Sequence, residues 1–167
     1  MDNKIAKVAL SMMQKNMGDI KRIEHSLKVF GYAQLLGVAE SLDEKTLEIL
    51  ELTALLHDIG IHVAEKKYGR STSHYQETEG PPVAHEVLTS LDFNPETIDR
   101  VCFIISKHHT FTAVDGIDFQ LLVEADFLVN SSEDHMNDHQ ITHFAKNIFS
   151  SESGFMYLKL LFPHIDF

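Results

Sequence analysis

Apolar residues recur along most of this chain at the spacing of buried helix faces. We predict helices over residues 4–17, 20–37 and 43–57, because apolar side chains stand three and four positions apart there. The third helix is apolar almost all round near its end, which is typical of a central buried helix. No segment shows the strict alternation of a half-buried strand, so the pattern predicts an all-α protein.

The second half of the chain continues the helical pattern. Residues 62–80 are polar with little periodicity, and we predict a loop there. Pro81 and Pro82 then favour the start of a new helix, because proline is tolerated in the first helical turn. Helices are predicted over residues 81–90, 95–108 and 118–130, with a loop over 110–117 and one or two amphipathic helices at the end.

Length and composition favour a single domain. The chain has 167 residues, 44% of them hydrophobic, which is enough for one core. We expect one domain over residues 1–167, with its core at about 20–130 and C-terminal helices over 131–167. The first residues lack the pattern of a secretory signal, and no stretch is apolar enough for a membrane helix. A lone cysteine, Cys102, suits a reducing compartment, so we expect a cytoplasmic protein with no membrane partner.

The charge balance limits the class of partner. The formal net charge is -11, from 14 basic and 25 acidic residues. A nucleic-acid polymer is therefore not an expected partner, because its backbone requires clustered Lys and Arg. A small phosphorylated substrate held by a metal is compatible with this charge. The sequence leaves the oligomeric state open, and a homo-oligomer is compatible with it.

Four side chains that can bind metal stand in apolar helical settings: His25, His57, Asp58 and Asp126. A lone buried histidine is usually a core residue with one hydrogen-bond partner. A buried carboxylate is harder to explain, because its charge is costly to bury unless it is paired or bound to a metal. Imidazoles and carboxylates together are typical ligands of a divalent transition metal. Three helices that each carry such groups therefore indicate one shared cation.

The segments that carry these residues, "RIEHSLKV", "ALLHDIG" and "VEADFLVN", resemble the HD-domain superfamily of metal-dependent phosphohydrolases. The family pattern is a His, then an adjacent His-Asp pair, then a distant Asp, and His25, His57, Asp58 and Asp126 fill these places over roughly residues 20–130. The resemblance implies an HD-domain-like helical bundle and a divalent metal at these four ligands, which could be Fe, Mn, Co, Ni or Zn. It also implies hydrolysis of a phosphoester or phosphoanhydride bond in a small phosphorylated substrate, often a nucleotide.

Some members of that superfamily hold a second metal through histidines between the His-Asp pair and the last Asp. His108 and His109 resemble the His-His pair of those members. The remaining place is ambiguous, because either His85 or Glu79 could occupy it. One metal is expected, and a second stays open. The alternative for His108 and His109 is a helix C-terminus, which favours partly cationic side chains.

Catalysis also needs a proton carrier and a cation for the phosphate. The candidates for acid or base are His108, His109, Glu77 and Glu79. The candidates for phosphate binding are Arg22, which precedes His25 by three residues and so shares its helix face, and Lys66 and Arg70 after the His-Asp pair. The alternative for the latter two is an ordinary solvated surface.

A second histidine pattern lies near the C-terminus. His135, His139 and His143 recur every four residues, which would line one helix face. Their neighbours are mostly polar, so we interpret them as a solvated face rather than a metal site.

Two other functions stay open. A few relatives of this fold are di-iron oxygenases, and that function would require a complete second set of ligands. A non-catalytic, ligand-sensing HD module is the other alternative, although such modules typically lose the metal ligands that this chain retains.

Overall fold

The protein is described here by a computed structural model that covers residues 3–167. These residues form nine α-helices and one short 3₁₀ helix, with no strand among them, which confirms the predicted all-α fold. None of these helices combines the length and apolarity needed to cross a membrane. The elements are α1 (Lys4–Lys15), α2 (Ile20–Ala39), α3 (Glu44–Leu56), α4 (Ile61–Tyr68), α5 (Ser73–Ser90), α6 (Pro95–Ile105), η1 (Phe111–Ala113), α7 (Ile117–Glu133), α8 (Asp138–Ile148) and α9 (Glu152–Leu161).

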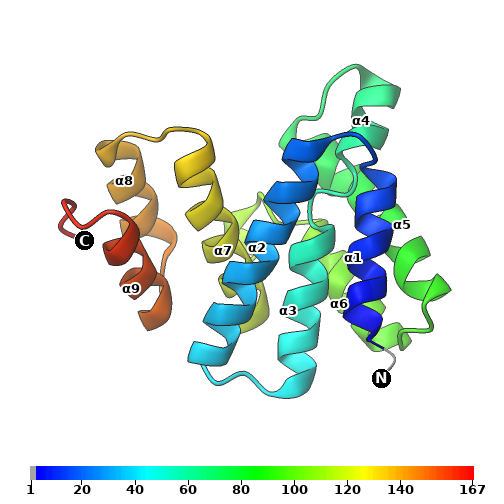
Figure 1. The fold of residues 1–167 in the computed structure, drawn as a ribbon, viewed down its shortest axis with the longest axis horizontal. Helices are drawn as coiled ribbons and strands as arrows, with labels where there is room; N and C mark the ends of the chain where they lie inside the picture. Colours follow the sequence, from blue (N-terminus) through cyan, green and yellow to red (C-terminus); the bar gives the residue numbers. More distant parts are fainter. Residues whose placement is uncertain (1–2) are drawn as a thin grey trace.

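Helix α3 is the central helix of the bundle, as predicted. It packs against α1, α2, α6 and α7, and every residue from Ile49 to Leu56 except Glu51 is buried. Figure 1 shows α8 and α9 at one end of the molecule, across α2 and α7 from α1 and α5. The carboxyl end of α3 is therefore surrounded by protein, and any polar side chain there must find partners inside the fold.

Side-chain caps define where most of these helices begin. Asp43 accepts hydrogen bonds from the backbone N–H groups of Lys45 and Thr46 at the start of α3. Asn94 accepts one from the N–H of Thr97 at the start of α6, as the sequence "FNPETIDRV" predicts. Each cap satisfies an N–H group that has no partner within the helix.

The loop predicted over residues 62–80 is wrong. Helix α4 occupies Ile61–Tyr68, and α5 begins at Ser73 and continues through Pro81 and Pro82 to Ser90. The sequence predicts a helix start at Pro81, but both prolines stand inside α5. Gly80 directly precedes Pro81 and has no Cβ to collide with the proline ring, which reduces the usual cost of this position. Packing of α5 on α4 and α6 overrides the weak local pattern.

Other differences concern helix ends and faces. The helix predicted over residues 95–108 ends at Ile105, so His108 lies in the turn that follows. On α2, Ile20 and Leu27 are exposed although their spacing predicted a buried face. The buried face is the one that carries His25.

Two carboxylates attach the start of α9 to the rest of the bundle. Glu124 of α7 is fully buried and accepts hydrogen bonds from the backbone N–H groups of Ser150 and Ser151 and from the Ser151 hydroxyl. Glu40, after α2, accepts from the backbone N–H and the hydroxyl of Ser153 at 2.9 and 2.6 Å. These bonds fix the chain that follows α8, and thereby hold α8 beside α7.

Candidate metal centre

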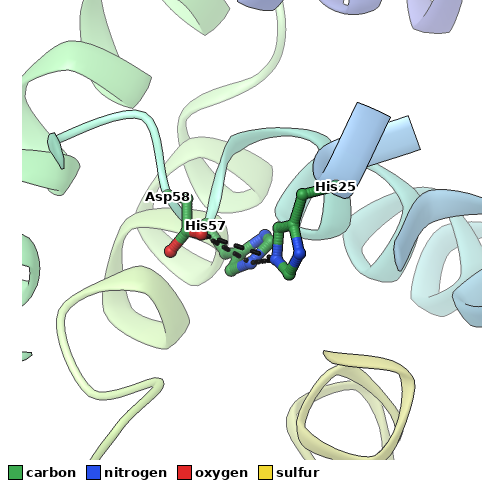
Figure 2. Close-up of side chains that lie close together, drawn as sticks. All are labelled: His25, His57 and Asp58. Atoms are coloured by element: carbon green, nitrogen blue, oxygen red, sulfur yellow. Dashed lines mark hydrogen bonds and ion pairs between the residues drawn. The ribbon is translucent and has the colours of Figure 1, made fainter. Parts of the chain in front are cut away.

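Three helices bring the four predicted ligands together. His25 lies on α2 and His57 caps the C-terminus of α3, with Asp58 immediately after it. Asp126 lies on the long buried helix α7. Figure 2 shows His25 approaching His57 and Asp58 from the neighbouring helix. His57 keeps helical dihedral angles, so the helical path of α3 continues through this residue.

The two histidine nitrogens lie at short and uniform distances from each other and from both carboxylates. His25 Nε2 lies 3.3 Å from His57 Nε2, 3.5 Å from Asp58 Oδ2 and 3.2 Å from Asp126 Oδ1. His57 Nε2 lies 3.5 Å from the same atom of each carboxylate. Ligand atoms bonded at about 2.1 Å to one tetrahedral metal ion are about 3.4 Å apart. The four donors therefore have the spacing of a metal-binding set.

Both imidazoles are held in the tautomer that binds metal. Nδ1 of His25 donates to Glu133 Oε2 at 2.8 Å, and Nδ1 of His57 donates to the backbone carbonyl of Ala54 at 2.9 Å. An imidazole that donates from Nδ1 presents a lone pair at Nε2. A carboxylate or carbonyl behind a metal-binding histidine is the usual support for this orientation.

The charges at the site keep both carboxyl groups ionised. Burial opposes ionisation of Asp58 and Asp126, but the adjacent imidazoles outweigh it, so the pKa of each carboxyl lies well below its usual range. Burial also opposes protonation of His57, yet the charges of Asp58 and Asp126 raise its pKa to about 9. The site therefore has a strong affinity for positive charge, which a divalent cation would satisfy.

A second donor group shares Asp58 with the first. His108 Nε2 lies 3.5 Å from Asp58 Oδ1, the oxygen other than the one near His25 and His57. Nδ1 of His108 donates to the carbonyl of Ile105 at 2.7 Å, so Nε2 carries the lone pair. Among residues 3–167, this Nε2 is one of two buried side-chain polar atoms without a hydrogen-bond partner. A buried acceptor without a partner is rare, and a metal ligand is one explanation for it.

His109 completes the second group. Its donor atom and those of Asp58 and His108 all lie within 4.8 Å of one another. Nε2 of His109 donates to Gln76 Oε1 at 2.9 Å, and its backbone N–H donates to Glu77 Oε1 at 3.0 Å. Burial lowers the pKa of His109 to about 4, so the ring is neutral near pH 7. Glu77 therefore positions the His109 backbone rather than joining the donor atoms.

The structure does not bring His85 or Glu79 to either group. His85 is exposed on α5, with its Nδ1 3.4 Å from Thr89 Oγ1. Glu79 accepts hydrogen bonds at 2.8 Å from Lys67 Nζ and from Tyr68 OH on α4. Residues Ser73–Ser90 form one continuous helix, and its buried face carries Gly80. Glu79 and His85 lie on other faces of that helix, so their side chains point away from the donor atoms.

The three candidates for phosphate binding contact groups outside the donor set. Arg22 forms ion pairs with Asp19 at 2.6 Å and Glu65 at 2.8 Å, so its charge is already balanced. Lys66 is exposed on α4, and the Arg70 guanidinium lies 5.6 Å from the centre of the Tyr75 ring. None of these contacts involves the four donor residues.

The C-terminal histidines do not line one helix face. His135 lies in the turn after α7 with a φ of 50°, whereas α8 begins at Asp138 and carries His139 and His143. The sequence spacing predicted one helix through all three positions, but the left-handed turn at His135 interrupts it. All three side chains are exposed, as expected for a solvated surface.

Glu133 and Gln76 are supporting residues that sequence reasoning missed. Glu133 stands seven residues after Asp126, two turns along one face of α7, and that spacing was the available signal. Gln76 stands in the segment interpreted as a loop, where no helical face was assigned.

Replacing Glu133 by alanine is expected to lower metal affinity by about 10- to 100-fold, because His25 loses the acceptor that orients its ring. Competition against a fluorescent chelator measures this affinity. Lys28→Met is the matched control, since it removes the other ion-pair partner of Glu133 and leaves the His25 bond. Equal affinities for Glu133→Ala and wild type would contradict the supporting role.

Comparisons with known proteins give a family and a fold for this chain. A model of the family described as HD domain matches residues 22–144. A search of the curated proteins finds no match. The crystal structure of a predicted HD superfamily hydrolase from an uncultured Thermotogales bacterium aligns with a TM-score of 0.66 and 20% sequence identity. The alignment covers 98% of this chain and 86% of that one, so the two share a fold across nearly their whole length.

Proposed function

Because this chain belongs to the HD-domain family, we propose that it is a metal-dependent phosphohydrolase. Its reaction would be the cleavage of a phosphoester or phosphoanhydride bond in a small phosphorylated substrate, with nucleotides as the favoured class. The observation that carries the proposal is the convergence of His25, His57, Asp58 and Asp126, in which each histidine nitrogen lies 3.2 to 3.5 Å from the other histidine and from one oxygen of each carboxylate.

The donor set fits a divalent transition metal. Two imidazoles with two carboxylates suit Fe, Mn, Co, Ni or Zn. Because the pKa of His57 is about 9 in the metal-free site, binding of the ion would release the proton from this imidazole. His25, His57, Asp58 and Asp126 would hold one ion, and Asp58, His108 and His109 would hold a second. A metal bound there supplies Lewis acidity, which lowers the pKa of a bound water and polarises a phosphoryl oxygen.

The side chains of this chain would orient the reaction around that site. Asp58 directs one oxygen toward each donor group, so it can accept a hydrogen bond from the attacking water while it stays ionised. With a single metal bound, Nε2 of His108 is the acceptor for the proton of that water, because its lone pair is buried and has no other partner among the described residues. The bond from His109 to Gln76 keeps the neighbouring ring fixed.

Metal analysis and metal removal test the proposal. Protein purified without an affinity tag is expected to contain at least one transition metal per chain by elemental analysis. It should release phosphate from p-nitrophenyl phosphate or from a nucleoside 5′-monophosphate, and a chelator should reduce this rate at least about tenfold until metal is added back. Protein that binds no metal after reloading, or that keeps its full rate in chelator, would refute it.

A di-iron oxygenase is a second candidate, because the two donor groups share Asp58. The second group offers three protein donors, and the structure does not add His85 or Glu79 to it. Iron-loaded protein that consumes oxygen but releases no phosphate would favour the oxygenase. A non-catalytic sensing module is disfavoured because all four residues of the family pattern are present and converge.

A further inference from the structure

The outer side of α9 is apolar at its centre and open to solvent. The inner side packs on α2 and α7, and Gly154 and Leu158 are buried there. On the outer side, Met156 is 49% exposed and Leu160, one turn later, is 72% exposed. Because residues at i and i+4 are neighbours on a helix, these two large side chains form one continuous apolar surface.

A groove of about 810 Å³ lies between the outer side of α9 and the end of α2. Its lining includes Ala39 and Glu40 from the end of α2 and its C-cap. Leu35 lies one turn before Ala39 on the same helix and is 55% exposed. Figure 1 shows α9 at the edge of the molecule, where another protein can reach it. Adjacent exposed apolar residues with polar residues at their rim are typical of a protein interaction site.

The two ends of this surface carry opposite charges. Glu152 stands in the first turn of α9 and Lys159 in the last, and both line the groove. They are seven residues apart, so they lie on one side of the helix, two turns from each other. Within residues 3–167, neither side chain has an ion pair or a hydrogen bond. Both charges are therefore available to a second molecule.

This surface, formed by Glu152, Phe155, Met156, Lys159 and Leu160 and called the α9 face below, is complementary to itself. Two copies that pack antiparallel about a twofold axis would meet at the middle of the face, between Phe155 and Met156. Each Glu152 would then lie opposite Lys159 of the second copy. A twofold interface uses the same patch on both molecules, so this patch must carry both members of each pair.

The overall charge makes the balance on this face important. Two chains with a formal net charge of -11 repel each other, so an interface between them requires cations of its own. Lys159 supplies one on each copy. Glu40 adds a second carboxylate at the acidic end of the groove, because it accepts hydrogen bonds from Ser153, the residue after Glu152. Lys159 of the second copy would therefore approach two negative charges.

We propose that the α9 face is the interface between two copies of this chain, packed antiparallel about a twofold axis near Met156. The apolar centre provides most of the affinity, since exposed ion pairs contribute little to it. The charged ends set the orientation, because a parallel arrangement would place like charges against each other. This interface is independent of the proposed phosphohydrolase function.

The oligomeric state of the full chain in solution tests the proposal. Sedimentation equilibrium is measured from about 1 to 100 μM protein, and we expect dimers to form within or below this range. Met156→Lys should raise the dissociation constant at least about tenfold, because it places two like charges beside the twofold axis. The matched control is Met17→Lys, which adds the same charge at a methionine that is 86% exposed in the turn after α1. This control should dimerise as wild type does.

Exchange of the two charges tests the antiparallel orientation. Glu152→Lys and Lys159→Glu should each weaken the dimer about tenfold, since each turns two attractive contacts into repulsive ones. The double variant Glu152→Lys/Lys159→Glu should restore the wild-type dissociation constant to within about threefold. Both substitutions oppose the dipole of α9, so damage to the helix alone would make the double variant the weakest of the three.

Three results would overturn the proposal. The first is a chain that stays monomeric up to about 100 μM. The second is a dimer that Met17→Lys disrupts and Met156→Lys does not, which would place the contact on another surface. The third is a double variant that dimerises no better than either single charge variant. Circular dichroism of each variant should show the helix content of wild type, so that loss of the dimer is not loss of the fold.

Discussion

Replacement of Asp58 by alanine is expected to remove most of the bound transition metal and to reduce phosphate release by at least about 1,000-fold, which corresponds to about 4 kcal/mol of transition-state stabilisation. The reason is the position of the carboxylate. Its Oδ2 lies 3.5 Å from Nε2 of both His25 and His57, and its Oδ1 lies 3.5 Å from Nε2 of His108. Loss of this side chain therefore removes a donor from both groups at once.

The Asp58→Ala experiment needs a check on other metal sites and on folding. A His135→Ala/His139→Ala double variant removes two exposed histidines near the C-terminus and should keep the metal content of wild type. Far-ultraviolet circular dichroism should show unchanged helix content in Asp58→Ala, because Asp126 no longer faces a second negative charge. Metal retained by Asp58→Ala and lost by the double variant would move the site to the surface and refute the metal centre described above.

Replacement of Gly60 by alanine is expected to destabilise the fold by about 2–4 kcal/mol. A Cβ at Gly60 would lie 2.4 Å from the backbone nitrogen and 2.7 Å from the Cα of Gly80. Both atoms belong to the backbone of α5, so a side-chain rotation cannot relieve the collision. Chemical denaturation measures the free energy of unfolding. Metal affinity should fall as well, because Gly60 follows Asp58 by two residues.

Gly31→Ala is the matched control for this substitution. Gly31 lies inside α2, and a Cβ there would have no neighbour within 4 Å. Because alanine is the better helix former, this variant should be more stable than wild type by up to about 1 kcal/mol. If Gly60→Ala unfolded at the same denaturant concentration as wild type, the close contact between the His-Asp turn and α5 would be disproved.

The sequence was sufficient to predict the all-α fold and the residues that converge between the helices. An ionisable residue at a position where the helical pattern predicts an apolar one indicates a buried polar group. His57 and Asp58 interrupt an apolar helix, and Asp126 stands between apolar neighbours on both sides. These conflicts, in the family order, predicted the residues that the structure brings together. The all-α fold followed from periodicity alone, because helix spacing is a local property.

The parts that could not be predicted depend on contacts between distant segments. Pro81 inside α5 is tolerated because of the packing around it, which no local pattern reveals. Once α5 extends to Ser73, Gln76 turns toward His109, while Glu79 turns toward Lys67 on α4. Arg22 shares a helix face with His25, but Asp19 and Glu65 hold its guanidinium. These outcomes depend on which partners the fold supplies.

Different helices carry the proposed metal ligands and part of the lining of a neighbouring cavity, and this separation affects how the protein can diverge. The proposed metal ligands come from α2, the end of α3 and α7, which pack against one another, whereas α8 lies at one end of the molecule and lines this cavity beside His109 and Asp126. Substitutions at the exposed positions of α8 therefore leave the donor atoms in place, whereas Ile141 and Ala145 on the same helix are buried in the core. During evolution, such a protein can acquire a new substrate by changing one peripheral helix while it retains its ancestral chemistry.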